Sequence, residues 1–148
     1  MKGFITRSIV ALCCMFAFCI NANAGSDTPI DVSQLPALSQ KIIKTHFSKC
    51  KVAMAKMESG IFDKSYDVVF TNGSKIEFDA KGNWKEIESK RHGVPNAIVP
   101  EPIRKYLKSH YPHKKVLKIE RDRKGYEIEL SNGLDIKFNK SFEVTEID

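Results

Sequence analysis

The chain has 148 residues, with 24 Lys and Arg against 18 Asp and Glu, four cysteines and 42% hydrophobic residues. This length allows one compact domain or two very small ones. Three of the four cysteines fall within the first 24 residues, so the rest of the chain carries a single thiol, Cys50. A single thiol can form neither an intramolecular disulfide nor a cysteine zinc site, which excludes a disulfide-stapled toxin and a zinc ribbon.

The N-terminus is typical of a secretory signal peptide. Lys2 and Arg7 precede an uncharged apolar run from Ser8 to Ile20, and small residues follow at Ala22 and Ala24. The alternative is an uncleaved membrane anchor, but thirteen residues are too few to cross a bilayer as a permanent helix. We therefore predict cleavage after Ala24, which leaves a periplasmic or secreted chain with 22 basic and 18 acidic residues, a net charge of +4, and no transmembrane segment.

Two segments of the predicted exported part of the chain resemble each other in sequence. At an offset of 64, Leu35–Phe47 matches Val99–Tyr111, and at an offset of 60, Tyr66–Phe78 matches Tyr126–Phe138. The matches keep their order and fall on turn glycines and apolar positions, which indicates a tandem repeat. The predicted organisation is a signal peptide (1–24), a lead-in (25–34), repeat 1 (35–89), a linker (90–98) and repeat 2 (99–148).

Each repeat is predicted to begin with a helix. Apolar residues recur at helical spacing, as Leu38, Ile42, Ile43 and Phe47 in repeat 1 and as Ile103, Tyr106, Leu107 and Tyr111 in repeat 2. Pro36 and Pro100 suit a first helical turn, where the missing N–H costs nothing. The polar remainder is expected to face solvent, so each helix has one side to bury; it comprises Lys41, Lys44 and Thr45 in repeat 1 and Lys105, Lys108 and Ser109 in repeat 2.

Four strands follow each helix, and the first of them are predicted at Lys51–Glu58 and Lys115–Asp122. The next two strands must share an apolar face, which favours a three-residue turn over a two-residue Asn-Gly turn. That turn places Val68 opposite Ile76. The last hairpin of repeat 1 is predicted to have a two-residue Gly82-Asn83 turn, with Phe78 opposite Ile87. The structural turn residues are then Asn72, Gly73 and Gly82 in repeat 1, and Asn132 and Gly133 in repeat 2.

The fold class that follows is α+β. Each repeat is one helix packed on a four-stranded antiparallel meander, which leaves the other face of the strands in water. A unit of about 50 residues is marginal alone. We therefore expect the two repeats to pack side by side, either sharing a core or continuing one sheet.

Residues at the helix starts, strands and turns of both repeats resemble those of the PepSY-like, beta-lactamase-inhibitor-like family of exported bacterial proteins. They are Leu35-Pro36, Tyr66–Phe78 with Gly82 and Trp84–Ile87, then Val99-Pro100 and Tyr126–Phe138 with Glu146-Ile147. The second repeat departs from the pattern at its last turn, where Lys140-Ser141-Phe142 has no glycine. The resemblance implies a periplasmic or secreted protein of tandem helix-plus-sheet units, and relatives by fold bind and inhibit other proteins through the open sheet face. Shared fold does not transfer function, so inhibition is an analogy.

The predicted partner-binding residues lie on the uncovered sheet face: Trp84, Val69, Glu86, Lys75 and Glu77. An exposed tryptophan in a charged field is typical of a hot spot for protein binding. The alternative is that Trp84 lies beneath the linker or the chain end, or at a bulge that turns it inward. Most of this face is then an ordinary solvated surface with cross-strand charge pairs.

Enzyme activity is not expected, because the sequence has no nucleophile elbow, no His-Glu-x-x-His and no glycine-rich phosphate loop. His46 and His110 are each predicted near a helix C-terminus, where the dipole favours them, and no metal site or cofactor is predicted. The basic run of repeat 2 is interspersed with acids, which disfavours a nucleic-acid partner. The sequence thus predicts an exported binding module for a protein partner; the alternatives are a small-ligand or ion-binding envelope protein that uses the crevice between the repeats, and a structural envelope component.

Overall fold

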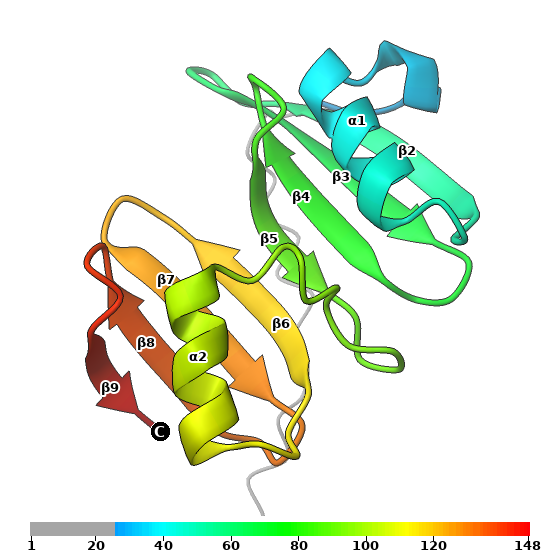
Figure 1. The fold of residues 1–148 in the computed structure, drawn as a ribbon. Coiled ribbons are helices and arrows are strands. Elements are labelled where there is room, and N and C mark those ends of the chain that lie inside the picture. Colours follow the sequence, from blue (N-terminus) through cyan, green and yellow to red (C-terminus); the bar gives the residue numbers. More distant parts are fainter. Residues whose placement is uncertain (1–25) are drawn as a thin grey trace, which may run out of the picture.

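The computed structural model describes residues 26–148, so the predicted signal peptide and its cleavage site lie outside the described residues. Two helices and nine strands make up this part of the chain (Figure 1). The first half contains β1 (Ser26–Pro29), the 3-10 turn η1 (Val32–Gln34), α1 (Ala37–His46), β2 (Val52–Ser59), β3 (Lys64–Phe70), β4 (Lys75–Asp79) and β5 (Trp84–Glu88). The second half contains α2 (Glu101–His110), β6 (Val116–Arg121), β7 (Gly125–Leu130), β8 (Asp135–Asn139) and β9 (Val144–Ile147).

All nine strands form one antiparallel sheet, in the order β1 to β9. The two halves continue a single sheet, because β5 pairs with β6 and places Ile87 opposite Ile119. Both helices lie on the same side of this sheet, α1 over the first half and α2 over the second (Figure 1). The α+β class is confirmed, and of the two arrangements expected for the repeats, the structure has the one in which they continue a single sheet.

Strand β1 was not predicted from the sequence. Its four residues, Ser-Asp-Thr-Pro, are all exposed and show no alternation of apolar and polar side chains. The pairing with β2 aligns Ser26 with Ser59 and Pro29 with Lys56. A proline is tolerated there because β1 is the edge of the sheet.

The three-residue turns are confirmed in both halves. Val68 pairs with Ile76 across the first turn, and Ile128 pairs with Ile136 across the second. Gly73 and Gly133 have φ angles of 86° and 82°, which explains why glycine follows asparagine in each turn. These registers direct the apolar side chains of all four strands toward the helices.

The register predicted for the last hairpin of the first half is wrong. Phe78 pairs with Trp84, and Ile87 pairs with Ile76. The turn has three residues, 80–82, between Asp79 and Asn83, and the Asp79 N–H donates to the Asn83 carbonyl at 2.8 Å. A β-bulge follows because Lys85 is an extra residue in β5. The bulge reverses the alternation within β5, so that Trp84 and Ile87 both point toward the helices. Trp84 is therefore buried, with 8% of its surface exposed: the predicted position on the uncovered face is wrong, and the alternative of a bulge that turns Trp84 inward is confirmed.

The second half has the same bulge, with Thr145 as the extra residue between Val144 and Glu146. Its turn contains no glycine, yet Phe142 adopts a φ of 62°, close to the 89° of Gly82. Phe142 stacks on Tyr126 with 5.6 Å between ring centroids. This packing offsets the strain of a left-handed backbone at a bulky residue.

One hydrophobic core lies between the sheet and the two helices. It contains residues of both halves, including Ile43 and Phe47 beside α1 and Ile103 and Leu107 from α2. Phe47 stacks on Phe70 at 5.1 Å, which fixes the end of α1 to β3. The helix-free side of the sheet contributes nothing to this core and is left for solvent or for a partner.

Candidate functional site

The helix-free side of the sheet, called the open face below, carries most of the charged strand residues. Directly paired residues form a row across eight strands, which we call the acidic row: Lys56, Asp67, Glu77, Glu86, Glu120, Glu127, Lys137 and Glu146. Five carboxylates follow one another without interruption between its two lysines. Like charges that lie directly opposite in a sheet repel and lower stability.

The junction of the two halves contains one of these like-charged pairs. Glu86 of β5 lies directly opposite Glu120 of β6. Lys118 lies beside both, with its Nζ 3.2 Å from a Glu86 oxygen and 3.5 Å from a Glu120 oxygen. Partial burial lowers the pKa of Lys118, but these two carboxylates outweigh it and hold the pKa above its usual value. Lys118 thus compensates part of the repulsion at the junction.

The β2 end of the acidic row is a network around Lys56. This ammonium contacts the carboxylates of Asp27, Glu58 and Asp67. Glu58 contributes most to raising the pKa of Lys56. Burial raises the pKa of Asp67, and the charges of Glu58 and Glu77 add to this effect, although the ion pair with Lys56 opposes it. The raised pKa of Asp67 thus comes first from burial and then from its acidic neighbours, and Lys56 offsets only part of it.

A second row lies beside the acidic row: Met54, Val69, Lys75, Glu88, Lys118, Glu129, Asp135 and Asp148. Together the two rows contain ten carboxylates and four lysines, a net charge of −6. The remaining residues from 26 to 148 contain 18 basic and eight acidic side chains, a net charge of +10. The protein therefore has an acidic open face and is basic elsewhere.

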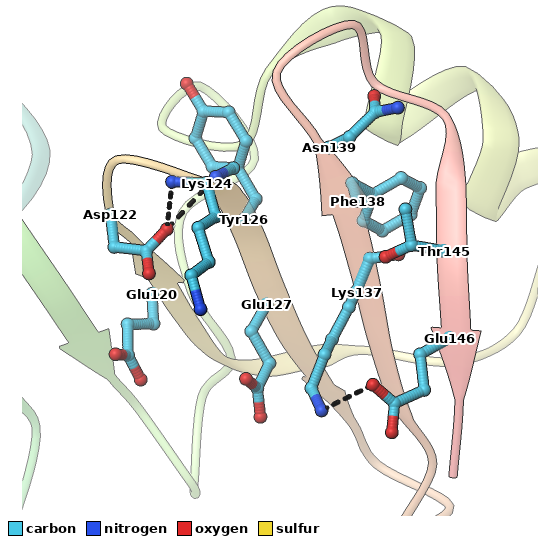
Figure 2. A pocket seen from close by; sticks show the side chains of 11 residues that line it. Glu120, Asp122, Lys124, Tyr126, Glu127, Lys137, Phe138, Asn139, Thr145 and Glu146 are labelled. Carbon is cyan, nitrogen blue, oxygen red and sulfur yellow. Dashed lines mark hydrogen bonds and ion pairs between the residues drawn. The ribbon is translucent and has the colours of Figure 1, made fainter.

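The open face is hollowed over the second half. Glu120, Glu127, Lys137 and Glu146 come from four adjacent strands and line a hollow of about 530 Å³. Figure 2 shows the side chains of Glu120, Glu127 and Lys137 leaving the sheet on the same side. Lys137 donates to Glu146 at 2.8 Å, while no ion pair to Glu127 is formed among the described residues.

The turn between β6 and β7 forms the rim of this hollow. Asp122 accepts hydrogen bonds from the backbone N–H groups of Lys124 and Gly125, at 2.7 and 3.0 Å. These bonds lower the pKa of Asp122, so its charge is held in place at the rim. The arrangement favours a cationic group, because four carboxylates line the hollow against two lysines, Lys124 and Lys137.

Four of the five predicted partner-binding residues lie on the open face. Val69 pairs with Lys75 in the second row, and Glu77 pairs with Glu86 in the acidic row. Trp84 lies on the opposite side of the sheet, beneath Arg121. The guanidinium lies 4.1 Å from the centre of the indole ring, and its Nε donates to the Trp84 carbonyl at 2.6 Å. Trp84 therefore links β5 to β6 and is not available as an exposed anchor.

Two exposed apolar residues were missed from the sequence. Ile61 and Phe62 occupy the turn between β2 and β3, with 84% and 97% of their surface exposed. The sequence did contain a sign of them, because two large apolar residues stand between Gly60 and Asp63. The matching turn of the second half has only Asp122, Arg123 and Lys124. Asp63 helps to raise the pKa of Lys85, a partner of Glu77, so this turn lies close to the acidic row.

Comparison with known proteins agrees with this architecture. The profile of a family described as "Putative beta-lactamase-inhibitor-like, PepSY-like" matches residues 64–146, more than half of the chain. The chain belongs to this PepSY-like family. The match spans β3 to β9, and so includes most of the acidic row. No curated protein matches the chain.

Solved structures of similar proteins exist from two Bacteroides species. A "putative calcium-regulated periplasmic protein" from Bacteroides thetaiotaomicron is 56% identical with a TM-score of 0.81, over 82% of this chain and 96% of that one. A "putative periplasmic protein" from Bacteroides vulgatus is 58% identical with a TM-score of 0.81, over 83% and 97%. A second one from that species, "of unknown function", is 41% identical with a TM-score of 0.78, over 83% and 99%.

Two further findings concern only the described part of this PepSY-like chain. None of its helices is long and apolar enough to span a membrane. Within residues 26–148, no three His, Cys, Asp or Glu side chains are grouped closely enough to hold a metal ion. Cys50 is a free, half-buried thiol that accepts a weak hydrogen bond from Asn72 at 3.4 Å.

Proposed function

We propose that this PepSY-like chain is an exported, non-enzymatic binding protein whose open face binds a basic surface of a partner protein. The observation that carries the proposal is the run of five successive carboxylates from Asp67 to Glu127. A sheet that only needed solubility could alternate charges, as Lys75, Glu88, Lys118 and Glu129 do in the second row. Cationic side chains of a partner would remove a repulsion that the free protein retains.

The exposed turn between β2 and β3 supplies the apolar part of this surface. Ile61 and Phe62 are almost fully exposed in the same turn as Asp63, whose charge acts on Lys85 of the Glu77–Lys85 ion pair (2.8 Å). Interfaces combine a few buried apolar or aromatic anchors with a polar surround. Phe62 thus takes the anchor role that the sequence had pointed to at Trp84.

The proposal includes three further statements: the protein is exported, its two halves are copies of one unit, and its binding inhibits the partner. The N-terminal segment and the periplasmic description of the similar structures support export. The two halves share element order, turns and bulges at constant offsets, from which we infer a duplicated unit. The family description supports an inhibitory form of binding, in which the open face and the Phe62 turn would cover a functional site of the partner.

The test first captures the partner and then compares its affinity for the wild type with its affinity for variants whose open-face carboxylates are neutralised. The bait is residues 25–148, crosslinked in envelope extracts of the native bacterium, and the captured protein is then purified and titrated against each variant. Neutralising Glu77, Glu86 and Glu127 with glutamine should weaken binding by at least about tenfold and reduce its salt dependence. The single variant Phe62→Ala should weaken binding by about 2 kcal/mol without loss of fold.

The matched control has the same change in net charge away from the open face: Asp31→Asn, Glu101→Gln and Glu143→Gln. It should bind as the wild type does. If the control weakens binding as much as the open-face variant, the net charge of the molecule and not this surface is responsible, and the proposal fails.

Calcium binding is a second candidate, favoured by the printed description of the 56% identical protein. Glu120, Glu127, Glu129 and Asp135 line a smaller hollow of about 130 Å³ beside Lys118. Carboxylate oxygens are the ligands that calcium prefers, but these four would have to move together to coordinate it. A rise in Tm with millimolar calcium that magnesium does not reproduce, and that Glu129→Gln abolishes, would support this candidate; an equal response to both ions would reject it.

A further inference from the structure

A second hollow lies on the helix side of the molecule, beside the segment that joins the two halves. It has a volume of about 600 Å³ and lies between residues 92–96, the C-terminal part of α2 and the start of β6. One arginine and three lysines line it, Arg104, Lys108, Lys114 and Lys115, together with His92, and no carboxylate does. The open face, which carries the proposed function, is on the other side of the sheet, so the two surfaces are independent.

The floor of this hollow is apolar and fixed in place. Val94 donates its N–H to the Val116 carbonyl at 2.8 Å, and Gly93 takes a φ of 81° to turn the segment over β6. A Cβ at Gly93 would lie 3.3 Å from that carbonyl, so the segment approaches β6 closely. Val94 and Leu107 are 6% and 7% exposed, and the half-buried Tyr111 completes the floor.

The first half of the chain closes the corresponding space. Gln40 of α1 matches Arg104 of α2 at the offset of 64. Its Nε2 donates to the carbonyls of Ser33 and Leu35, at 3.1 and 2.8 Å, and so ties α1 to the lead-in. Arg104 makes no such bond among residues 26–148 and lines the hollow instead. The space in the second half stays open and is lined by a cation in place of an amide.

The four cations of this hollow form no ion pair within residues 26–148. The nearest acid on α2, Glu101, is paired with Lys105 at 2.9 Å, while it also feels the charge of Arg104. Four cations that converge around an apolar floor attract an anion and favour one that also has an apolar part.

We propose that this hollow binds an amphiphilic organic anion. The acidic head group, a carboxylate, sulfonate or phosphate, lies between Arg104, Lys108 and the Lys114-Lys115 pair. The apolar part lies on Val94, Leu107 and Tyr111. Arg104 is the main specificity residue, because a guanidinium presents paired donors to the oxygens of such a head group.

The test uses anilinonaphthalene sulfonate, a fluorescent aromatic anion, with residues 25–148. We expect saturable binding at one site, weakened by at least about tenfold in Arg104→Gln, which copies the residue of the first half. The control Lys105→Gln removes the same charge from the neighbouring position and should bind as the wild type does. Circular dichroism of both variants establishes that the fold is intact.

Competition defines the ligand chemistry. Laurate should displace the probe, while dodecanol, with the same chain and no charge, and inorganic phosphate, with charge and no chain, should not. Vesicles that contain phosphatidylglycerol distinguish a lipid head group from a free anion as the source: displacement by vesicles that depends on Arg104 supports the lipid. The proposal is overturned by non-saturable binding, by equal weakening in Lys105→Gln, or by displacement with dodecanol or phosphate as effective as with laurate.

Discussion

Asp79 and Asn139 occupy matching positions in the last turn of each half. Both accept hydrogen bonds from backbone N–H groups of their turn, but only Asp79 can carry a charge. Asp79 accepts hydrogen bonds from the N–H groups of Lys81 and Asn83, both at 2.9 Å. Asn139 accepts the corresponding bonds from Ser141 and Glu143, at 2.9 and 3.0 Å. The side chain that accepts these backbone hydrogen bonds is therefore ionisable only in the first turn.

The response to acid follows from the pKa of Asp79. Partial burial opposes ionisation, but the hydrogen bonds from Asn83, Lys81 and Gly82 outweigh it and lower the pKa below its usual value. A carboxyl group whose pKa is lower in the folded state stabilises the fold above its unfolded pKa of 3.8. That stability is lost as the pH falls through the folded pKa.

We therefore predict that Asp79→Asn lowers the free energy of unfolding at neutral pH by up to about 1 kcal/mol, because a charged acceptor is replaced by a neutral one. The difference should vanish at a pH low enough to protonate Asp79 in the folded state, where both side chains are neutral. Denaturant unfolding at both pH values measures it. Asp63→Asn, outside this turn, is the control. A deficit of the same size at both pH values would mean that the charge of Asp79 is irrelevant and that the turn itself is disturbed.

At the scale of elements, the pairing of β5 with β6 holds the two halves in one sheet. Ile87 and Ile119 meet across it on the core side, both fully buried. Arg121 adds a second link, since it donates to the Trp84 carbonyl and covers the indole ring. On the open face the same junction carries the Glu86–Glu120 repulsion, so the core side must hold it together.

Arg121→Ala should lower the free energy of unfolding by about 1 to 3 kcal/mol, because a hydrogen bond and a cation–π contact are lost together. Trp84 is the only tryptophan of the chain, so its fluorescence reports the loss directly. Arg123→Ala, in the exposed turn two residues later, should change neither quantity. Unchanged stability in Arg121→Ala would show that Ile87 and Ile119 are sufficient to hold the junction.

The bulges mark the limit of what the sequence could predict. Alternation of apolar residues placed the helices, the strands and the three-residue turns, because each depends on local spacing. A bulge changes the alternation within a strand, and its position is set by hydrogen bonds to the neighbouring strand. The only local sign is the spacing of three between Trp84 and Ile87, which recurs between Val144 and Ile147. Reading that spacing as a bulge would have placed Trp84 inside.

The candidate site was predictable only in part, for a related reason. Val69, Lys75, Glu77 and Glu86 were placed on the open face correctly because β3, β4 and the end of β5 keep their alternation. The continuous acidic row was not foreseen, since it depends on Glu86 meeting Glu120 between strands that are 34 positions apart. The Phe62 turn was missed because no alternation extends into a turn.

At the scale of the whole molecule, one sheet and one core predict a single unfolding transition. Ile136 is fully buried in β8, and Ile136→Ala should cost about 2 to 5 kcal/mol. In this variant the midpoint of unfolding should move to a lower denaturant concentration. The midpoint should be the same by circular dichroism, which reports both halves, and by Trp84 fluorescence. A biphasic transition by circular dichroism would show that the second half unfolds alone and that the junction does not couple the halves.

The separation of charge between the open face and the rest of the protein makes the whole molecule a dipole. With −6 on the two rows and +10 elsewhere, it experiences a torque near any charged surface. Close to an anionic surface the helices turn toward that surface and the open face turns outward, within the distance of about 8 Å at which physiological salt screens the field. The chain can therefore orient itself before any specific contact is made.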